Sequence, residues 1–349
     1  MSSNIQTYRY DFRSDTLTKP TPAMLEAMIN AQVGDDVYKE DPTIIQLEAY
    51  AAKLTGKEAA VFCASSTMSN QIAVRSHIIT PPCSVICDDR AHIHRYEAGG
   101  MALFSQATTY SIHPKNKVYI TAEEIKSNII PYGDEHFPPT RLIEIENTLG
   151  GSIMPLEEMK KIYELAQSKD IPVHLDGARL WNVCAATQTD MKLWTSQVDS
   201  VNLCLSKGIG APVGAILAGS SKFIERARLF RKMMGGGWRQ AGVLAAAALV
   251  AIETIWPRMA DDHRRAKELS EGLLKLGIPT IIPTDTNMVM ADTSKVGLDV
   301  KKLSEECLKH GVKIRDSAPN MIRFVLHHQI EDEAIQIVLD SAKKTLNSQ

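Results

Sequence analysis

The middle of the chain alternates between short apolar runs and longer segments of helical periodicity, and this alternation restricts the fold more than any other feature. Apolar runs of strand length occupy residues 58–64, 83–88, 141–147, 171–176, 199–206 and 214–219. Other segments place apolar residues at helical spacing, notably 41–56, 67–79 and 155–170. A chain that alternates strands and helices in this way is predicted to fold as an α/β sheet covered by helices.

After residue 258 the pattern of predicted helices and strands changes. It predicts an amphipathic helix over 261–278 and another helix near 298–310, with strand-like runs at 287–292, 311–316 and 320–327. Such a mixture is typical of a small α+β domain. We therefore expect two domains in this chain of 349 residues: an N-terminal segment with a large α/β domain over 1–257, and a smaller C-terminal domain over 258–349.

Composition narrows the possible partners and the compartment. The net charge is −2 and no run of lysine and arginine occurs, which argues against a nucleic-acid partner. The longest apolar run, 241–252, is too short to span a bilayer and predicts a buried helix, so we expect no membrane partner. Residues 1–15 carry no targeting pattern. We expect a cytoplasmic protein whose six cysteines are reduced core thiols, namely Cys63, Cys83, Cys87, Cys184, Cys204 and Cys307.

Two predicted strands end in residues suited to chemistry. Lys207 stands between the apolar run 199–206 and a glycine-rich turn, where it would lose hydration and its neutral amine would become available as a nucleophile. Asp176 ends the run 171–176, and a buried carboxylate there requires a cationic or N–H partner. The alternatives are a surface lysine at the start of a loop, and an aspartate that caps a helix or pairs with Arg179.

A third signal is the run Ser65, Ser66 and Thr67, which follows a predicted strand and begins a predicted helix. Hydroxyl groups and free backbone N–H groups at a helix N-terminus bind anions, although similar residues also cap helices that bind nothing. An anion seat, a buried acid and an activated amine match the phosphate, the ring nitrogen and the aldehyde of pyridoxal 5′-phosphate. The three signals together therefore predict that cofactor.

The chain resembles the threonine aldolases, which are pyridoxal-phosphate enzymes with the aspartate-aminotransferase fold. The resemblance extends over most of the sequence and is carried by nine strings at residues 11–28, 33–44, 66–71, 91–100, 140–148, 173–182, 206–215, 231–242 and 322–327. It implies a large domain with a mostly parallel seven-stranded sheet and a smaller α+β C-terminal domain. It also implies retro-aldol cleavage of L-threonine, L-allo-threonine or related β-hydroxy-α-amino acids to glycine and the matching aldehyde.

The resemblance assigns the cofactor site residue by residue. Lys207 matches the lysine that forms the internal aldimine, and Asp176 matches the carboxylate that keeps the pyridine nitrogen protonated. Arg179 matches an arginine beside the pyridoxal oxygen, where it is also expected to help bind the substrate. Ser66 and Thr67 fall on the phosphate positions.

The resemblance also assigns residues to the substrate. Arg323 matches the arginine that holds the substrate carboxylate, and Ser14 a serine near it. His92 matches an imidazole stacked on the cofactor ring, and His136 a second histidine near the β-hydroxyl group, so either is a candidate base. Tyr96 is expected among the substrate contacts.

Two more residues, Lys232 and Arg239, flank the triple glycine of 235–237 and match residues that approach the site from a neighbouring subunit. We therefore expect a homo-oligomer, at least a dimer and more specifically a tetramer built as a dimer of dimers. Two departures from the bacterial pattern matter. Ser66 replaces a glycine at the phosphate position, and Leu149 replaces a histidine near the site, so the resemblance assigns no stereopreference at the β-carbon.

Three other readings remain open. A related pyridoxal-phosphate β-eliminating lyase or transaminase would use the same cofactor residues, and a catalytically silent homologue would act as a binding or scaffold protein. Dinucleotide binding is not expected, because the glycine-containing segment 208–212 lacks the full dinucleotide signature. We expect no metal site, because the histidine pairs 92/94 and 327/328 lack further ligands at zinc spacing.

Overall fold

The computed structural model describes residues 8–316, 318 and 320–348, which form two compact units. The larger unit consists of residues 19–149 and 153–256, and the smaller one of residues 8–18 and 150–152 and the described residues of 257–348. The N-terminal segment, which we predicted with the large domain, therefore groups with the C-terminal residues. The reason is a parallel pairing of β1 (Tyr10–Asp11) with β10 (Val312–Lys313).

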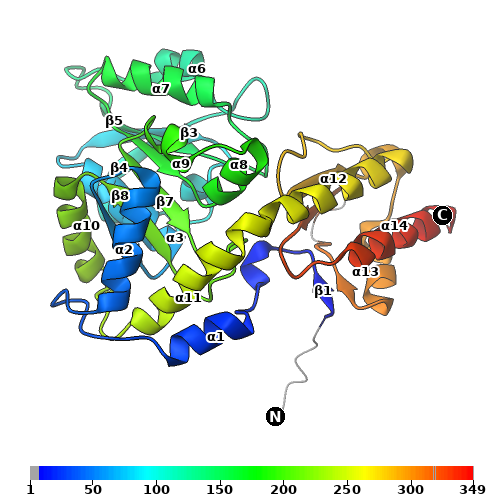
Figure 1. The fold of residues 1–349 in the computed structure, drawn as a ribbon. Coiled ribbons are helices and arrows are strands. Elements are labelled where there is room, and N and C mark those ends of the chain that lie inside the picture. Colours follow the sequence, from blue (N-terminus) through cyan, green and yellow to red (C-terminus); the bar gives the residue numbers. More distant parts are fainter. Residues whose placement is uncertain (1–7, 317, 319, 349) are drawn as a thin grey trace, which may run out of the picture. The chain divides into compact units, whose positions relative to one another are not determined.

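The larger unit contains a seven-stranded sheet, as expected from the resemblance (Figure 1). Only β8 runs antiparallel to its two neighbours, β2 and β7, and the other pairings are parallel. The strands are short and, apart from the middle of the edge strand at Ala107–Ile112, mostly buried, as parallel strands covered on both faces must be. In sheet order they are β2 (Ala59–Cys63), β8 (Ala215–Gly219), β7 (Ser200–Cys204), β6 (Val173–Asp176), β5 (Thr140–Glu146), β3 (Cys83–Asp88) and β4 (Ala107–Ile112).

Helices cover this sheet, and their ends follow from local sequence signals. The helix α2 (Pro42–Thr55) is capped at its start by Asp41, whose carboxylate accepts hydrogen bonds from the N–H groups of Thr43 and Ile44, and at its end by Gly56, which has a φ of 65°. The other helices of the unit are α1 (Pro22–Ile29), α3 (Ser66–His77), α4 (His92–Arg95), α5 (Gly100–Ser105), α6 (Ala122–Asn128), α7 (Leu156–Gln167), α8 (Leu180–Thr187), α9 (Met191–Thr195), α10 (Ser221–Met233) and α11 (Gly242–Thr254).

The apolar helix α11 packs against α1 and α2 inside the larger unit. Its alanines Ala245, Ala247, Ala248 and Ala251 are fully buried, which confirms the prediction of a buried helix. By length and composition alone, the stretch Gly242–Lys275 is apolar enough to cross a membrane, but 39% of its most apolar window is buried inside the structure. Core helices of soluble proteins meet the same criterion.

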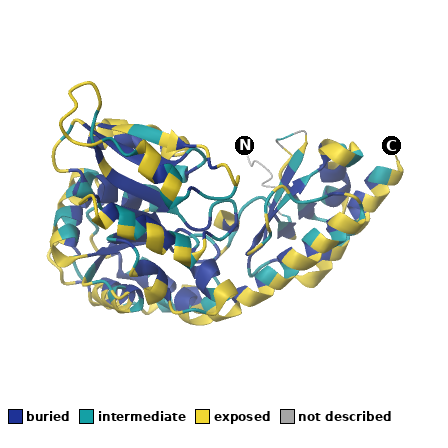
Figure 2. Cartoon of the chain, turned by 90° about the horizontal axis from the view of Figure 1, so that it is seen from above, coloured by how far each residue is buried: buried dark blue, intermediate teal, exposed yellow. Residues whose placement is uncertain are grey.

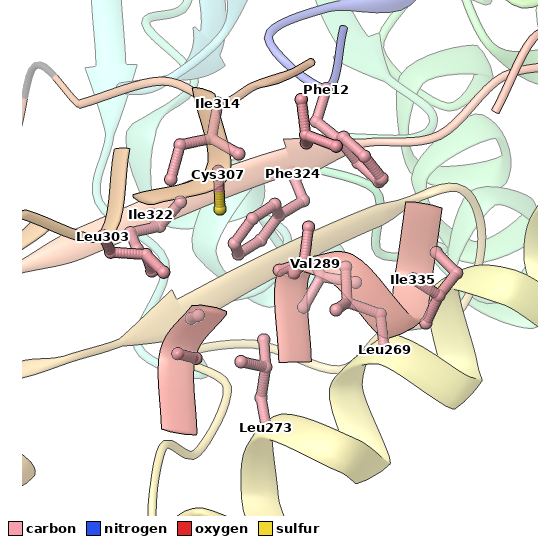
Figure 3. Close-up of a cluster of buried hydrophobic side chains, with 14 of the residues drawn as sticks. Phe12, Leu269, Leu273, Val289, Leu303, Cys307, Ile314, Ile322, Phe324 and Ile335 are labelled. Atoms are coloured by element: carbon pink, nitrogen blue, oxygen red, sulfur yellow. The ribbon is translucent and has the colours of Figure 1, made fainter. Parts of the chain in front are cut away.

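The smaller unit has the α+β composition predicted for the C-terminal domain. Besides β1 and β10 it contains an antiparallel pair, β9 (Met288–Asp292) with β11 (Met321–Val325), and three long helices, α12 (Met259–Lys275), α13 (Val300–Lys309) and α14 (Asp332–Asn347). Its core joins the N-terminal segment to the rest, since the rings of Phe12 and Phe324 meet edge to face at 6.0 Å between centroids (Figure 3).

Burial follows the same layers in both units (Figure 2). Most strand residues are dark blue, whereas the outer helices show one buried and one exposed face. All six cysteines are free and buried, which confirms their prediction as core thiols. Burial raises the pKa of Cys63 and of Cys184 to about 12, so these thiols are protonated at neutral pH.

Candidate active site

The predicted site gathers at the edge of the sheet where the parallel strands β6 and β7 end. These strands are neighbours, and Asp176 at the end of β6 lies opposite Asn202 on β7. Lys207 stands in the turn that follows β7, closed by a hydrogen bond from the N–H of Gly210 to its carbonyl oxygen. In an open α/β sheet the carboxyl ends of the strands form the usual ligand site, so the fold brings the predicted acid and amine to the expected place.

Asp176 is a buried carboxylate with a complete set of donors. Its oxygens accept hydrogen bonds from Asn70 Nδ2 at 2.8 Å, from Asn202 Nδ2 at 3.1 Å and from the N–H of Ala178 at 2.9 Å. Burial alone would raise its pKa, but the Lys207 ammonium and the Asn70 amide outweigh burial and lower the pKa below its usual value. The carboxylate is therefore ionised although only 2% of the residue is exposed.

His92 is held by a second buried acid. Its Nδ1 lies 2.8 Å from Oε1 of Glu97, whose other oxygen accepts a hydrogen bond of 2.6 Å from Gln71 Nε2. The hydrogen bond with Glu97 raises the pKa of His92, against the effect of burial. Glu97 accepts this hydrogen bond, so Nδ1 carries the proton, and in the neutral ring Nε2 is left as an acceptor. Tyr96 lies beside this pair, exposed, with its ring 5.7 Å from the imidazole.

The ligand atoms of His92, Glu97 and Asp176 lie within 4.8 Å of one another, close enough to surround a metal ion. However, Asn70 Nδ2 already donates to both carboxylates, at 2.9 Å to Glu97 and 2.8 Å to Asp176. We therefore assign the cluster to a hydrogen-bond network. The expectation that no metal takes part stays a prediction.

The predicted phosphate seat lies at the N-terminus of α3. Ser65 caps the helix by accepting a hydrogen bond of 3.1 Å from the N–H of Met68, so its hydroxyl group is occupied. Ser66 and Thr67 are the first two helical residues and are partly exposed. Ser66 Oγ accepts a hydrogen bond from Asn202 Nδ2, which links the helix end to the donors of Asp176. The helix dipole and the first N–H groups of this helix favour an anion.

The remaining predicted residues lie in several parts of the fold. Arg179 begins α8, three residues after Asp176. Ser14 and Arg323 are brought together within the smaller unit, since Arg323 Nη2 donates to the carbonyl oxygen of Arg13 at 3.2 Å. His136 lies on the exposed loop before β5, and no hydrogen bond or ion pair among the described residues joins it to His92.

The two predicted subunit-boundary residues are exposed. Lys232 lies in the last turn of α10, and Arg239 pairs with Asp35 at 2.9 Å. Arg231, the residue before Lys232, is buried instead and pairs with Asp36. The string 231–242 therefore contains one cation with a structural role, Arg231, which the sequence alone did not separate from the exposed cations.

Sequence reasoning missed the side chains that surround Asp176. Asn70 and Asn202 donate to it, and Glu146 accepts a hydrogen bond of 2.9 Å from the N–H of His92. Burial and the charge of Asp176 raise the pKa of Glu146 to about 7. A signal was present, because three successive apolar strands each carry polar residues two positions apart and so on one face, namely 144/146, 174/176 and 200/202.

Comparisons with known proteins agree with this geometry. The family model of the beta-eliminating lyases matches residues 11–295. The chain is similar to the low-specificity L-threonine aldolase of Eremothecium gossypii, at 45% identity over 328 residues, covering 93% of this chain and 85% of the relative. It is similar to that of Saccharomyces cerevisiae at 42% identity over 330 residues, covering 94% and 84%. Its fold is similar to that of Leishmania major threonine aldolase, with a TM-score of 0.83 at 19% identity and coverage of 97% and 99%.

Proposed function

This chain belongs to the beta-eliminating lyase family, and we propose that it cleaves L-threonine, L-allo-threonine and related β-hydroxy-α-amino acids to glycine and an aldehyde. It is a lyase that depends on pyridoxal 5′-phosphate. The observation that carries the proposal is the ionised, buried Asp176 beside Lys207 at neighbouring strand ends. A protein gains no stability from burying such a charge unless a cationic group faces it.

The residues of the site fit this cofactor. Lys207 would supply the amine for its aldehyde, and Asp176 the carboxylate for its ring nitrogen. Ser66, Thr67 and the N-terminus of α3 would hold the phosphate group, with Arg179 beside the ring oxygen. One buried acceptor at the site, Oδ1 of Asn202, has no hydrogen-bond partner among the described residues, as expected where a bound group completes the network.

When bound, the cofactor draws electrons from Cα of the amino acid and so weakens one bond there. Asp176 serves this chemistry because its negative charge holds a proton on the ring nitrogen. His92, fixed by Glu97 through Nδ1, presents Nε2 to take the proton of the β-hydroxyl group, directly or through water. His136 remains the second candidate base on the evidence of the resemblance.

The substrate carboxylate is proposed to bind Arg323 and Ser14, with Arg179 and Tyr96 as further contacts. A bidentate pair with the Arg323 guanidinium would fix the rotation of the amino acid and so select the bond that breaks. A hydrogen bond from Arg323 Nη2 to the carbonyl oxygen of Arg13, the residue before Ser14, supports this proposal.

We propose a cytoplasmic homo-oligomer, at least a dimer and in its full form a tetramer. The exposed Lys232 and Arg239 would then reach the active site of a neighbouring subunit. Lys232 lies next to the triple glycine, where the main chain at Gly235 has a φ of 81°. That conformation suits glycine, and it lets the segment turn close to the exposed cations.

The test is product analysis with the purified protein and added pyridoxal 5′-phosphate. The four threonine stereoisomers are supplied in turn, and glycine and acetaldehyde are measured. Only an aldolase yields glycine, so keto acid or ammonia without glycine would favour the transaminase or the β-eliminating lyase and refute the proposal.

A substitution of Lys207 tests whether this residue is needed for the reaction. Lys207→Ala is expected to lose both the visible absorbance of bound cofactor and turnover, because it removes the amine that the proposal assigns to the aldehyde. Lys169→Ala, a lysine that is exposed in the same unit, is the control and is expected to behave as the unaltered protein. Unchanged turnover by Lys207→Ala would remove Lys207 from catalysis.

A further inference from the structure

A line of hydrogen-bonded side chains leads from Asp176 to the opposite edge of the sheet. Asn70 on α3 contacts Asp176 at 2.8 Å and His174 Nε2 at 3.2 Å. His174 Nδ1 lies 2.8 Å from Ser200 Oγ, which in turn lies 2.7 Å from His77 Nε2. Every contact in this line is within hydrogen-bond distance, and all its members belong to the larger unit.

The direction of each hydrogen bond follows from the donors available. Both hydrogens of Asn70 Nδ2 are used, one for Asp176 and one for Glu97, so Asn70 Oδ1 must accept from His174 Nε2–H. Burial lowers the pKa of His174 to about 4, so the ring is neutral at pH 7 and its Nδ1 is an acceptor.

The same reasoning settles the outer half of the line. Since His174 Nδ1 accepts, the hydroxyl group of Ser200 must donate to it. Ser200 Oγ then accepts from Nε2–H of His77, whose pKa burial lowers to about 3. All the hydrogen bonds therefore run one way, from His77 through Ser200, His174 and Asn70 to the carboxylate of Asp176.

A series of hydrogen bonds that all donate in one direction stabilises a negative charge on the last acceptor, here the carboxylate of Asp176. Hydrogen bonds in series polarise one another, and each donates toward Asp176, so together they stabilise its ionised form. They act against the neighbouring acids Glu97 and Glu146 and together with Lys207, and His92 adds to the effect when its ring is protonated. Glu144, which lies beside His174 on β5, is buried without a partner among the described residues, and burial raises its pKa well above the usual value.

The outer end of the line reaches a surface pocket. His77 lines this pocket of about 340 Å³ together with Asp199, Lys222 and Arg226, and its ring packs on Phe223 at 4.5 Å between centroids. The line thus spans the sheet from the candidate active site to a second opening, where the outermost ring is partly exposed.

We propose that His174, Ser200 and His77 are positioning residues for the reaction: they fix the donor direction of Asn70, keep Asp176 ionised, and so hold the proton on the cofactor nitrogen. This inference rests on the proposed function for its effect on the rate. None of the three residues needs to touch the substrate, because each acts through the next side chain in the line.

The first test needs neither cofactor nor substrate. In the cofactor-free protein labelled with ¹⁵N-histidine, NMR is expected to show both His174 and His77 as neutral Nε2–H tautomers from pH 6 to 8. The variants His174→Gln and His77→Gln assign the signals by their loss. An Nδ1–H tautomer or a charged ring at either position would break the one-way line and overturn the proposal.

The second test measures the effect on the bound cofactor. Ser200→Ala and His174→Leu each interrupt the line, and we expect the pH midpoint of the visible cofactor band to rise by about one unit. The same variants are expected to lose about tenfold in kcat with little change in KM. His174→Gln keeps an N–H donor near the Nε2 position and is expected to recover most of the midpoint and of kcat.

The control separates positioning from general damage. Ser76→Ala changes a serine that precedes His77, is 2% exposed, and has no hydrogen-bond partner for its hydroxyl group among the described residues. It is expected to leave the midpoint and kcat unchanged. Equal behaviour of Ser200→Ala and Ser76→Ala, or a loss of kcat without any shift of the midpoint, would overturn the proposal.

Folding and function are kept apart in this design. Thermal unfolding of each variant shows whether it is folded, and Ser200→Ala, which removes only one oxygen, replaces His174→Leu if the latter does not fold. If the unaltered protein binds the cofactor but forms no glycine, the proposed function fails. The tautomers and the midpoint still decide the role of the line.

Discussion

The buried pair of Arg231 and Asp36 allows the sharpest prediction about stability. Arg231 Nη2 lies 2.5 Å from Asp36 Oδ2, and the two side chains are only 5% and 4% exposed. Arg231 Nη1 also donates to the carbonyl oxygen of Phe62 at 2.6 Å. The substitution Asp36→Ala would leave a guanidinium group buried without its carboxylate, and such a loss destabilises a protein by about 3–5 kcal/mol.

This magnitude is large against the whole stability of the fold. Domains are stable by about 5–15 kcal/mol in total. For a unit of this size each kcal/mol lowers Tm by about 2–4 °C, so Asp36→Ala should lower Tm by about 6–20 °C. The measurement is calorimetric or urea-induced unfolding of the cofactor-free protein, with the unaltered chain beside it.

A double-mutant cycle tests the reason for the effect. Arg231→Met with Asp36→Ala removes the buried charge altogether, so the double variant should be less destabilised than Asp36→Ala alone. The control is Asp35→Ala, which removes the partner of the exposed Arg239 from the adjacent position. An exposed pair contributes little. Equal Tm values for Asp36→Ala and Asp35→Ala would refute the argument from burial.

Two further predictions concern pH. Burial raises the pKa of Asp262 to about 7 in the folded state, so its ionisation opposes folding as pH rises from about 4 to 7. Asp262→Asn should therefore increase the free energy of unfolding by on the order of a few kcal/mol at pH 8 and hardly at pH 4, measured by urea unfolding. Glu97 raises the pKa of His92, so Glu97→Gln should move the acid limb of the kcat/KM profile to lower pH, and an unmoved limb would exclude His92 as its source.

Much of the sheet could be predicted from the sequence, because buried parallel strands are continuous apolar runs. The antiparallel direction of β8 could also be predicted from the sequence. Only residues 205–214 separate β7 from β8, which is too short for a crossover helix and so requires an antiparallel neighbour. The pairing of β1 with β10 was not within reach, because a two-residue strand has no periodicity and its partner lies some three hundred residues away.

The candidate site could be predicted only in part. Asp176 and Lys207 follow apolar runs directly, so their place at the sheet edge is a local property of the sequence. Asn70 is brought to Asp176 by the packing of α3 across β6 and β7, and Asn202 by the pairing of β7 with β6, and no local pattern encodes either contact. Hydrogen-bond partners of a buried acid are in general a tertiary property, whereas the need for them is visible in the sequence.

The polar face of the sheet shows where this fold favours chemistry over stability. The strands β5, β6 and β7 each place two polar residues on one buried face, at 144/146, 174/176 and 200/202. Apolar residues at these positions would fold well, so the polar ones need another reason. Row 146/176/202 lies at the sheet edge beside the proposed cofactor site. Row 144/174/200 lies one step deeper, and the hydrogen bonds of His174 and Ser200 connect it to Asp176 through Asn70. The polar residues His174 and Ser200 of the deeper row are thus explained by their stabilisation of the negative charge on Asp176 in the outer row.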